Sequence, residues 1–175
     1  MKAVFVDRDG TLIKDIGYPH RSEDFNMLPS TSKAIKKLNE GRYLVIVVTN
    51  QSGVARGYFS EKEMKKFNAY LISEFRKKGA RIDAIYCCPH HKNAKIKKYR
   101  KDCVCRKPKP GMLLRAAREH RIDLKESWMV GDKKSDVLAG KAAGCKTIFI
   151  GARSLGADEV AKDLKQAAKH ILRKR

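Results

Sequence analysis

Residues 3–12 read Ala3-Val4-Phe5-Val6-Asp7-Arg8-Asp9-Gly10-Thr11-Leu12, a short apolar run that ends in two carboxylates and a glycine turn. Side chains alternate along a strand, so Asp7 and Asp9 start out on the same side of it. The turn then lets the second carboxylate face the first across a small pocket. Such a pair can hold a divalent cation, and one carboxylate can attack while the other moves a proton. The alternative is a plain turn, in which Asp bonds its own backbone and Gly supplies positive φ.

Three further segments favour a catalytic or metal-binding site over a plain turn. They are Thr49-Asn50-Gln51, Arg106-Lys107-Pro108, and Gly131-Asp132 with Asp136. All of them fall where predicted strands end or loops begin. Because the carboxyl ends of the strands form the ligand crevice of an open α/β sheet, we expect these segments to meet.

Apolar runs alternate with helical patterns along the chain. We predict strands over residues 3–6, 43–48, 82–86, 128–130 and 147–150, and helices over residues 32–39, 60–78, 111–120, 135–143 and 158–172. This alternation predicts an α/β fold, a Rossmann-like three-layer sandwich with a mainly parallel central sheet and no large cap domain. The length of 175 residues fits a single domain spanning 1–175.

Composition narrows the classes of protein. The chain is 42% hydrophobic, enough for a core, and its sequence holds no 18-residue apolar run, so we expect no membrane span. A strand begins within two residues of the N-terminus, which predicts no signal peptide, and the expected compartment is the cytoplasm. We also expect a monomer. The net charge of +21 fits either an anionic partner or a generally basic proteome, and the even spread of Lys and Arg favours the second.

Four of the five cysteines lie between residues 87 and 105. In a cytosolic protein such crowding indicates a metal rather than disulfides, although a disulfide or plain thiols are the alternative. We call residues 87–109 the cysteine loop, and we expect zinc to order it and to position Arg106 and Lys107. Three thiolates and one imidazole suit tetrahedral structural zinc. The predicted zinc ligands are Cys88, His90, Cys103 and Cys105.

Taken in order, these segments resemble the motifs of the haloacid-dehalogenase-like superfamily of phosphohydrolases. The resemblance extends to residues 15–18, 49–57, 88–91, 103–112 and 131–133, and it covers about residues 3–150. Within that superfamily the match is to the branch that contains sugar-bisphosphate and histidinol phosphatases. Each motif is weak alone, but the ordered set is specific.

The resemblance implies a catalytic set of Asp7, Asp9, Thr49 and Lys107. Asp7 would attack phosphorus, Asp9 would act as general acid and base, and Lys107 would balance charge. Thr49 would bind the transferring phosphoryl group, for which a β-turn is the alternative interpretation.

The same resemblance implies Mg²⁺, held by the Asp7 side chain, the Asp9 backbone carbonyl and Asp132. Asp136 would be a further ligand or an acceptor behind the ligands. Helix capping is the alternative role for Asp132 and Asp136.

Substrate contacts are implied at nine positions. Arg106 would grip a second phosphate through two hydrogen bonds, and a solvated surface role is the rival interpretation for Tyr18 and Lys133. The nine positions are Asp15, Ile16, Gly17, Tyr18, Asn50, Gln51, Ser52, Arg106 and Lys133.

The leading hypothesis is a Mg²⁺-dependent phosphatase that acts on a small sugar bisphosphate. Histidinol-phosphate phosphatase and polynucleotide 3′-phosphatase are the enzymatic alternatives. The basic residues of the cysteine loop favour a second phosphate, and the lack of an evident stacking-aromatic stripe counts against DNA. A zinc-stabilised nucleic-acid-binding module without activity is the non-enzymatic alternative, against which the complete carboxylate set argues.

Overall fold

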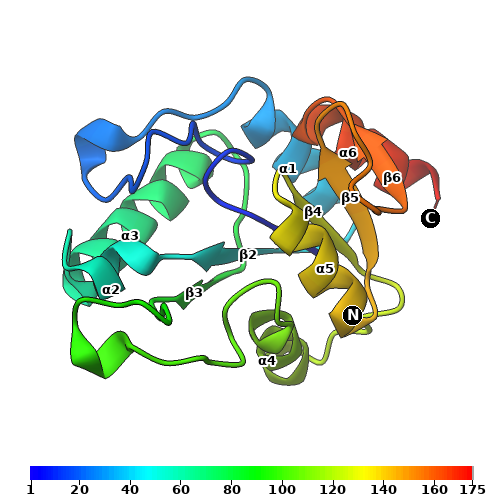
Figure 1. Ribbon diagram of the computed structural model, residues 1–175. Coiled ribbons are helices and arrows are strands. Elements are labelled where there is room, and N and C mark those ends of the chain that lie inside the picture. The colour runs from blue at the N-terminus through cyan, green and yellow to red at the C-terminus, as the bar shows by residue number, and fades with distance from the viewer. Residues whose placement is uncertain (175) are drawn as a thin grey trace.

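The computed structural model describes residues 1–174, which form a three-layer α/β arrangement around one parallel sheet (Figure 1). The strands run in the order β3-β2-β1-β4-β5-β6. The order reverses between β1 and β4, so ligands are expected beyond the carboxyl ends of these strands. The strands are β1 (Ala3–Val6), β2 (Leu44–Asn50), β3 (Ala84–Cys88), β4 (Trp128–Gly131), β5 (Lys146–Ile150) and β6 (Glu159–Ala161).

Helices cover both faces of the sheet. Helices α1 (Thr31–Glu40), α3 (Glu61–Lys77) and α6 (Leu164–Arg173) pack on one face. Helices α4 (Gly111–His120) and α5 (Lys134–Ala143) pack on the other. The shorter elements are α2 (Ser52–Arg56) and the 3₁₀ turns Ser22–Asp24 and Lys97–Tyr99.

Strand β2 shows why the sheet is buried on both sides. Val45 and Val47 face the α1, α3 and α6 layer, while Ile46 and Val48 face α4 and α5. Successive side chains of a strand point to opposite faces, so a continuous apolar run serves two cores. The predicted parallel sheet is therefore confirmed.

Helix α3 forms where its start signal and its apolar stripe agree. The Ser60 hydroxyl accepts a hydrogen bond from the Glu63 backbone N–H, and Glu63 accepts one from the Ser60 N–H. Phe67, Leu71 and Phe75, at helical spacing, are buried in the core. The predicted helix is confirmed.

The sheet departs from the sequence-based expectation at three places. Residues 158–172 were expected to form one helix, but Glu159–Ala161 pairs with β5 as a sixth strand. The prediction was wrong because a three-residue edge strand is too short to show a period, and Asp163 begins the helix by accepting from Gln166 N–H. In addition, β2 extends through Asn50 and β3 through Cys88, beyond the apolar runs that predicted them.

The connection from β1 to β2 holds a loop, one 3₁₀ turn and α1, so no helical domain is inserted there. Across residues 1–174, we find no helix that is both long and apolar enough to traverse a bilayer.

Gly140 tests how tightly α5 packs on the sheet. A Cβ at this position would lie 2.6 Å from Met129 Cβ and 2.7 Å from Thr147 Cγ2. Helix propensity alone predicts that Gly140→Ala stabilises the protein by about 1 kcal/mol. We expect the contact to reverse the sign, with a loss of about 1–3 kcal/mol in the free energy of unfolding, measured by urea denaturation.

The matched control is Leu138→Ala, which changes an exposed side chain of the same helix. It should alter the free energy of unfolding by no more than about 0.5 kcal/mol. A Gly140→Ala variant that is as stable as the parent would show that α5 moves away from β4 at little cost.

Candidate active site and metal cluster

A buried lysine ties the cysteine loop to the centre of the sheet. Lys107 Nζ donates to Asp7 Oδ1 at 2.7 Å and to the Val48 carbonyl oxygen at 2.7 Å. The same ammonium lies 2.6 Å from Asp136 Oδ1. Burial alone would lower the pKa of Lys107, but Asp7 and Asp136 together raise it above the usual value. The lysine therefore stays charged between two carboxylates.

Three carboxylates gather at the carboxyl ends of β1 and β4. Asp7, Asp132 and Asp136 each offer an oxygen within 4.8 Å of the others. Burial, followed by the neighbouring Asp7 carboxylate, raises the pKa of Asp132. The nearby charge of Lys133 only partly offsets this shift. Clustered oxygen donors are what a hard divalent cation prefers.

The turn after Asp9 fits closely around Asp132. Gly10 has φ +90°, and a Cβ there would lie 2.3 Å from Asp132 Oδ2. The Thr11 hydroxyl donates to Asp132 Oδ1 at 3.3 Å. Glycine is thus required both by the backbone angle and by the space that the carboxylate occupies.

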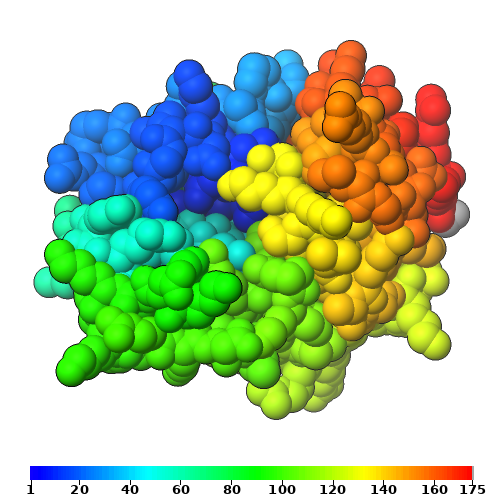
Figure 2. All heavy atoms as spheres, viewed as in Figure 1, coloured from blue at the N-terminus to red at the C-terminus, as the bar shows by residue number. Residues whose placement is uncertain are grey.

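A pocket of about 460 Å³ is lined by Asp9 and Lys107, while Asp7 and Asp132 are not part of its lining. Figure 2 shows the face on which the loop after β1 (blue), the segment after β2 (cyan), the cysteine loop (green) and the segment after β4 (yellow) meet around a hollow. Eight of the nine predicted substrate-contact residues line this pocket, whereas Ile16 is 50% exposed and lies outside the lining. The lining residues are Asp9, Asp15, Gly17, Tyr18, Asn50, Gln51, Ser52, Arg106, Lys107, Lys133 and Ser135.

The cations at the pocket are individually anchored. Lys133 Nζ donates to Asp15 Oδ2 at 2.9 Å. Burial lowers the pKa of Lys133, but the hydrogen bond with Asp15 and the charge of Asp7 outweigh it, so the net shift is upward. The Arg106 guanidinium donates to the His90 carbonyl oxygen at 3.1 Å. Each side chain is therefore held by a partner within the protein.

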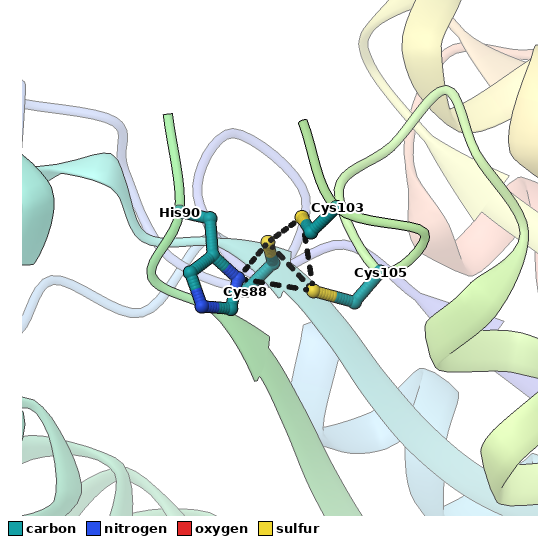
Figure 3. Close-up of side chains that lie close together, drawn as sticks. All are labelled: Cys88, His90, Cys103 and Cys105. Carbon is teal, nitrogen blue, oxygen red and sulfur yellow. Dashed lines mark hydrogen bonds between the residues drawn. The ribbon is translucent and has the colours of Figure 1, made fainter. Parts of the chain in front are cut away.

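The four predicted zinc ligands converge from the two ends of the cysteine loop (Figure 3). The three sulfurs of Cys88, Cys103 and Cys105 lie 3.0–3.4 Å apart. His90 Nδ1 lies 3.4 Å from Cys105 Sγ and 3.7 Å from Cys88 Sγ. In a tetrahedral zinc site with Zn–S bonds of about 2.3 Å, neighbouring sulfurs lie about 3.8 Å apart, so the cluster is close to that shape.

The thiols of the cluster are free, and one of them is acidic. The hydrogen bond between Cys88 and Cys105, together with the contacts to Cys103 and His90, lowers the pKa of the Cys105 thiol to about 5. Soft sulfur donors with one imidazole suit zinc among the common divalent metals. The cluster is therefore compatible with a structural zinc site.

The chain is similar to known proteins over most of its length. The chain is 47% identical over 149 residues to a D-glycero-β-D-manno-heptose-1,7-bisphosphate 7-phosphatase of Pasteurella multocida, covering 85% of this chain and 80% of the relative. It is 40% identical over 150 residues to a D-glycero-α-D-manno-heptose-1,7-bisphosphate 7-phosphatase of Photorhabdus laumondii, covering 86% of this chain and 82% of that one. The family model described as "HAD-hyrolase-like" matches residues 104–174.

The chain belongs to the haloacid-dehalogenase-like phosphatases. It is therefore a phosphoric monoester hydrolase. Its fold also matches a solved structure, a D,D-heptose 1,7-bisphosphate phosphatase from B. bronchiseptica complexed with magnesium and phosphate. That comparison gives a TM-score of 0.86 and 30% identity, and it covers all of both chains.

Two predicted residues of this haloacid-dehalogenase-like site use their side chains inside the protein. The Asn50 amide donates to the Lys107 carbonyl oxygen at 3.0 Å and accepts from the Lys107 N–H at 3.1 Å. The Thr49 hydroxyl is buried and accepts from Gln51 Nε2 at 2.8 Å. In the structure, Asn50 fixes the backbone of Lys107, and Thr49 fixes Gln51.

Sequence reasoning missed three residues around this haloacid-dehalogenase-like pocket. Ser135 lines it from the first turn of α5. Arg8 pairs with Asp9, and Asn68 of α3 pairs with Arg8. An arginine between two carboxylates was the available signal for Arg8. Asn68 gave none, because a polar residue within an amphipathic helix is expected at the surface.

Lys107→Met tests the paired lysine with a side chain of similar length. The change leaves Asp7 and Asp136 without their shared partner, so we expect a loss of about 3–5 kcal/mol in the free energy of unfolding. Phosphatase activity should fall by at least about a hundredfold. Thermal denaturation and a phosphate-release assay measure the two effects.

Lys109→Met is the control, because Lys109 forms only an exposed ion pair with Asp102. It should change stability by no more than about 1 kcal/mol. Equal melting temperatures for the two variants would contradict the central role given to Lys107.

Proposed function

We propose that this enzyme hydrolyses a small sugar bisphosphate, the 7-phosphate of D-glycero-D-manno-heptose 1,7-bisphosphate. The observation that carries the proposal is the pocket of about 460 Å³, whose lining contains Arg106 and Lys133 together with Asp9. That volume suits a small ligand. Two cations beyond the reacting end supply a place for a second phosphate, and relatives of this chain carry the name of this activity.

The proposed reaction has two steps at Asp7. Asp7 attacks phosphorus, the P–O bond to the sugar breaks, and the leaving oxygen takes a proton from Asp9. Water then attacks phosphorus, the bond to Asp7 breaks, and Asp9 takes the proton of the water. Lys107, held 2.7 Å from Asp7 Oδ1, keeps the nucleophile oriented in both steps.

We further propose that Mg²⁺ is held by the side chains of Asp7 and Asp132 and by the Asp9 backbone carbonyl. The crowding of buried carboxylates that raises the pKa of Asp132 supports a cation here. When bound, Mg²⁺ supplies positive charge between the nucleophile and the phosphoryl group. Both oxygens of Asp136 are engaged, Oδ1 by Lys107 and Oδ2 by the Lys133 backbone N–H, so we assign Asp136 a role behind the ligands.

A panel of phosphate monoesters tests the substrate. It contains both anomers of the heptose bisphosphate, histidinol phosphate and a 3′-phosphorylated oligonucleotide, each with and without Mg²⁺. We expect kcat/KM to be about tenfold to a hundredfold higher for the bisphosphates, because a charge-assisted hydrogen bond contributes about 1.5–3 kcal/mol. Phosphate release should need Mg²⁺ for every substrate.

Asp7→Asn is the control for this panel. It should abolish turnover of every substrate while the protein remains folded, because Lys107 keeps its contacts with Asp136 and Val48. Histidinol phosphate as the best substrate would replace the proposed function with its nearest rival, and the oligonucleotide as the best substrate would favour a DNA 3′-phosphatase.

We propose that the cysteine loop holds zinc through Cys88, His90, Cys103 and Cys105. Arg106 and Lys107 follow the last ligand directly, so ordering this cluster also orders two pocket residues. Zinc would act by position and would not touch the substrate. We also propose that the protein acts as a monomeric, single-domain enzyme of the cytoplasm with no nucleic acid partner.

Zinc content and stability test the cluster. The purified protein should carry about one zinc per chain, and Cys105→Ser should lose it because a tetrahedral structural site needs all four ligands. The variant should also melt at a lower temperature, because metal binding contributes to folding. Elemental analysis and thermal denaturation supply the two measurements.

Cys145→Ala is the matched control, because Cys145 is buried in the α4 and α5 layer, outside the cluster. It should keep its zinc. Zinc below about half an equivalent in the parent protein would count against the metal assignment.

A further inference from the structure

Arg8 lies between Asp7 and Asp9 in the sequence, and its side chain has no exposed surface. Its Nε donates to Asp9 Oδ1 at 2.8 Å and its NH2 group to Asp9 Oδ2 at 3.0 Å. NH1 donates to Asn68 Oδ1 at 2.9 Å, and NH2 also donates to the Pro19 carbonyl oxygen at 3.0 Å. Burying a guanidinium is costly unless it is paired and hydrogen-bonded, and here it is both.

The planar guanidinium also rests on an aromatic ring. Its central carbon lies 4.9 Å from the centre of the Phe67 ring. Asn68, next to Phe67 on α3, donates its amide to Cys87 Sγ at 3.2 Å. A chain of contacts thus runs from β3 through α3 to Arg8 and then to Asp9. The position of the Asp9 carboxylate is set by the core.

The pairing leaves one acceptor position of Asp9 available toward the pocket. A carboxylate offers about four lone-pair positions, two on each oxygen. Oδ2 accepts from both Arg8 and Gln51, whose Nε2 lies at 3.0 Å, while Oδ1 accepts from Arg8. Three of the four positions are therefore occupied, and the one that remains is on Oδ1. Asp9 lines the pocket, where this position is available to a ligand.

We propose that Arg8 is a positioning residue that fixes the plane of the Asp9 carboxylate, so that Oδ1 faces the reacting phosphoryl group. This inference rests on the proposed chemistry at Asp7. In the second step, a water oxygen bonds to phosphorus, the P–O bond to Asp7 breaks with its electron pair returning to Asp7, and a water proton passes to Asp9 Oδ1. The products are inorganic phosphate and the free carboxylate of Asp7.

A two-point pairing explains why an arginine stands here. Lysine would carry the same charge but donate as a point, so the carboxylate could turn about that single contact. Arginine donates in a rigid fork, which fixes both the position and the plane. Misplacing a catalytic group by about 1 Å costs on the order of a hundredfold in rate. The geometry of the fork, beyond its charge, is what we expect catalysis to require.

The test separates the two steps by the choice of substrate. The leaving group of 4-nitrophenyl phosphate departs without protonation, so only the second step needs Asp9. We expect Arg8→Lys and Arg8→Gln to release about one nitrophenolate per active site in a rapid burst and then to turn over about a hundredfold more slowly than the parent. An acid quench with labelled substrate should trap the phosphorylated enzyme, and Asp7→Asn should trap none.

A purely structural role for Arg8 predicts a different result. It would lower the amount of folded, active protein but leave the ratio of the two steps unchanged, so no burst would appear. Folded Arg8 variants that lack the burst, or that turn over within about threefold of the parent, would overturn the proposal. Arg118→Gln, at an exposed position on α4, is the control and should behave as the parent.

Asn68→Leu provides a second variant in case both Arg8 variants fail to fold. It removes the acceptor for Arg8 NH1 but leaves both bonds to Asp9. We expect it to slow turnover of 4-nitrophenyl phosphate about tenfold and to accumulate phosphorylated enzyme, because the guanidinium loses one of its supports. A folded Asn68→Leu variant with the turnover of the parent and no trapped phosphoenzyme would also overturn the proposal.

This assay does not depend on the natural substrate. If the heptose bisphosphate proves to be a poor substrate, the proposed specificity fails, while the burst still reports on Arg8. If wild-type protein forms no phosphorylated enzyme with any monoester, the proposed chemistry at Asp7 fails, and the role of Arg8 fails with it.

Discussion

The ion pair between Lys107 and two buried carboxylates, Asp7 and Asp136, organises the site. It joins three parts of the chain that are far apart in sequence, namely the end of β1, the end of the cysteine loop and the first turn of α5. Burying three charged groups is unfavourable unless each is paired, so the fold must bring all three segments together to bury any of them. The same contacts fix the carboxylate of Asp7, which we propose as the nucleophile.

Around this ion pair, different cations balance the buried carboxylates and line the pocket. Lys107 compensates the carboxylates from within, while Arg106 and Lys133 line the pocket above them. A structural metal in the cysteine loop would stabilise both arrangements, because Arg106 and Lys107 directly follow Cys105. We therefore view the cysteine loop as one wall of the active site whose shape depends on the four-ligand cluster.

The sequence predicted most of the sheet and most of the pocket, because both depend on local signals. Apolar runs marked five strands, and the polar residues at their ends marked the pocket. It did not predict β6, whose three residues carry no period, nor the internal use of the Asn50 amide. The partners of Arg8 could not be predicted for a different reason: Asn68 and Pro19 become its neighbours only when α3 and the first loop fold over β1.

The clamp between Asn50 and the backbone of Lys107 has an evolutionary consequence. It closes the chain from residue 50 to residue 107 into a loop whose two ends are fixed by two hydrogen bonds. The exposed residues of the cysteine loop can therefore change in number or charge while the backbone of Lys107 stays fixed to β2. The clamp thus makes the position of the lysine tolerant of variation at the rim of the pocket.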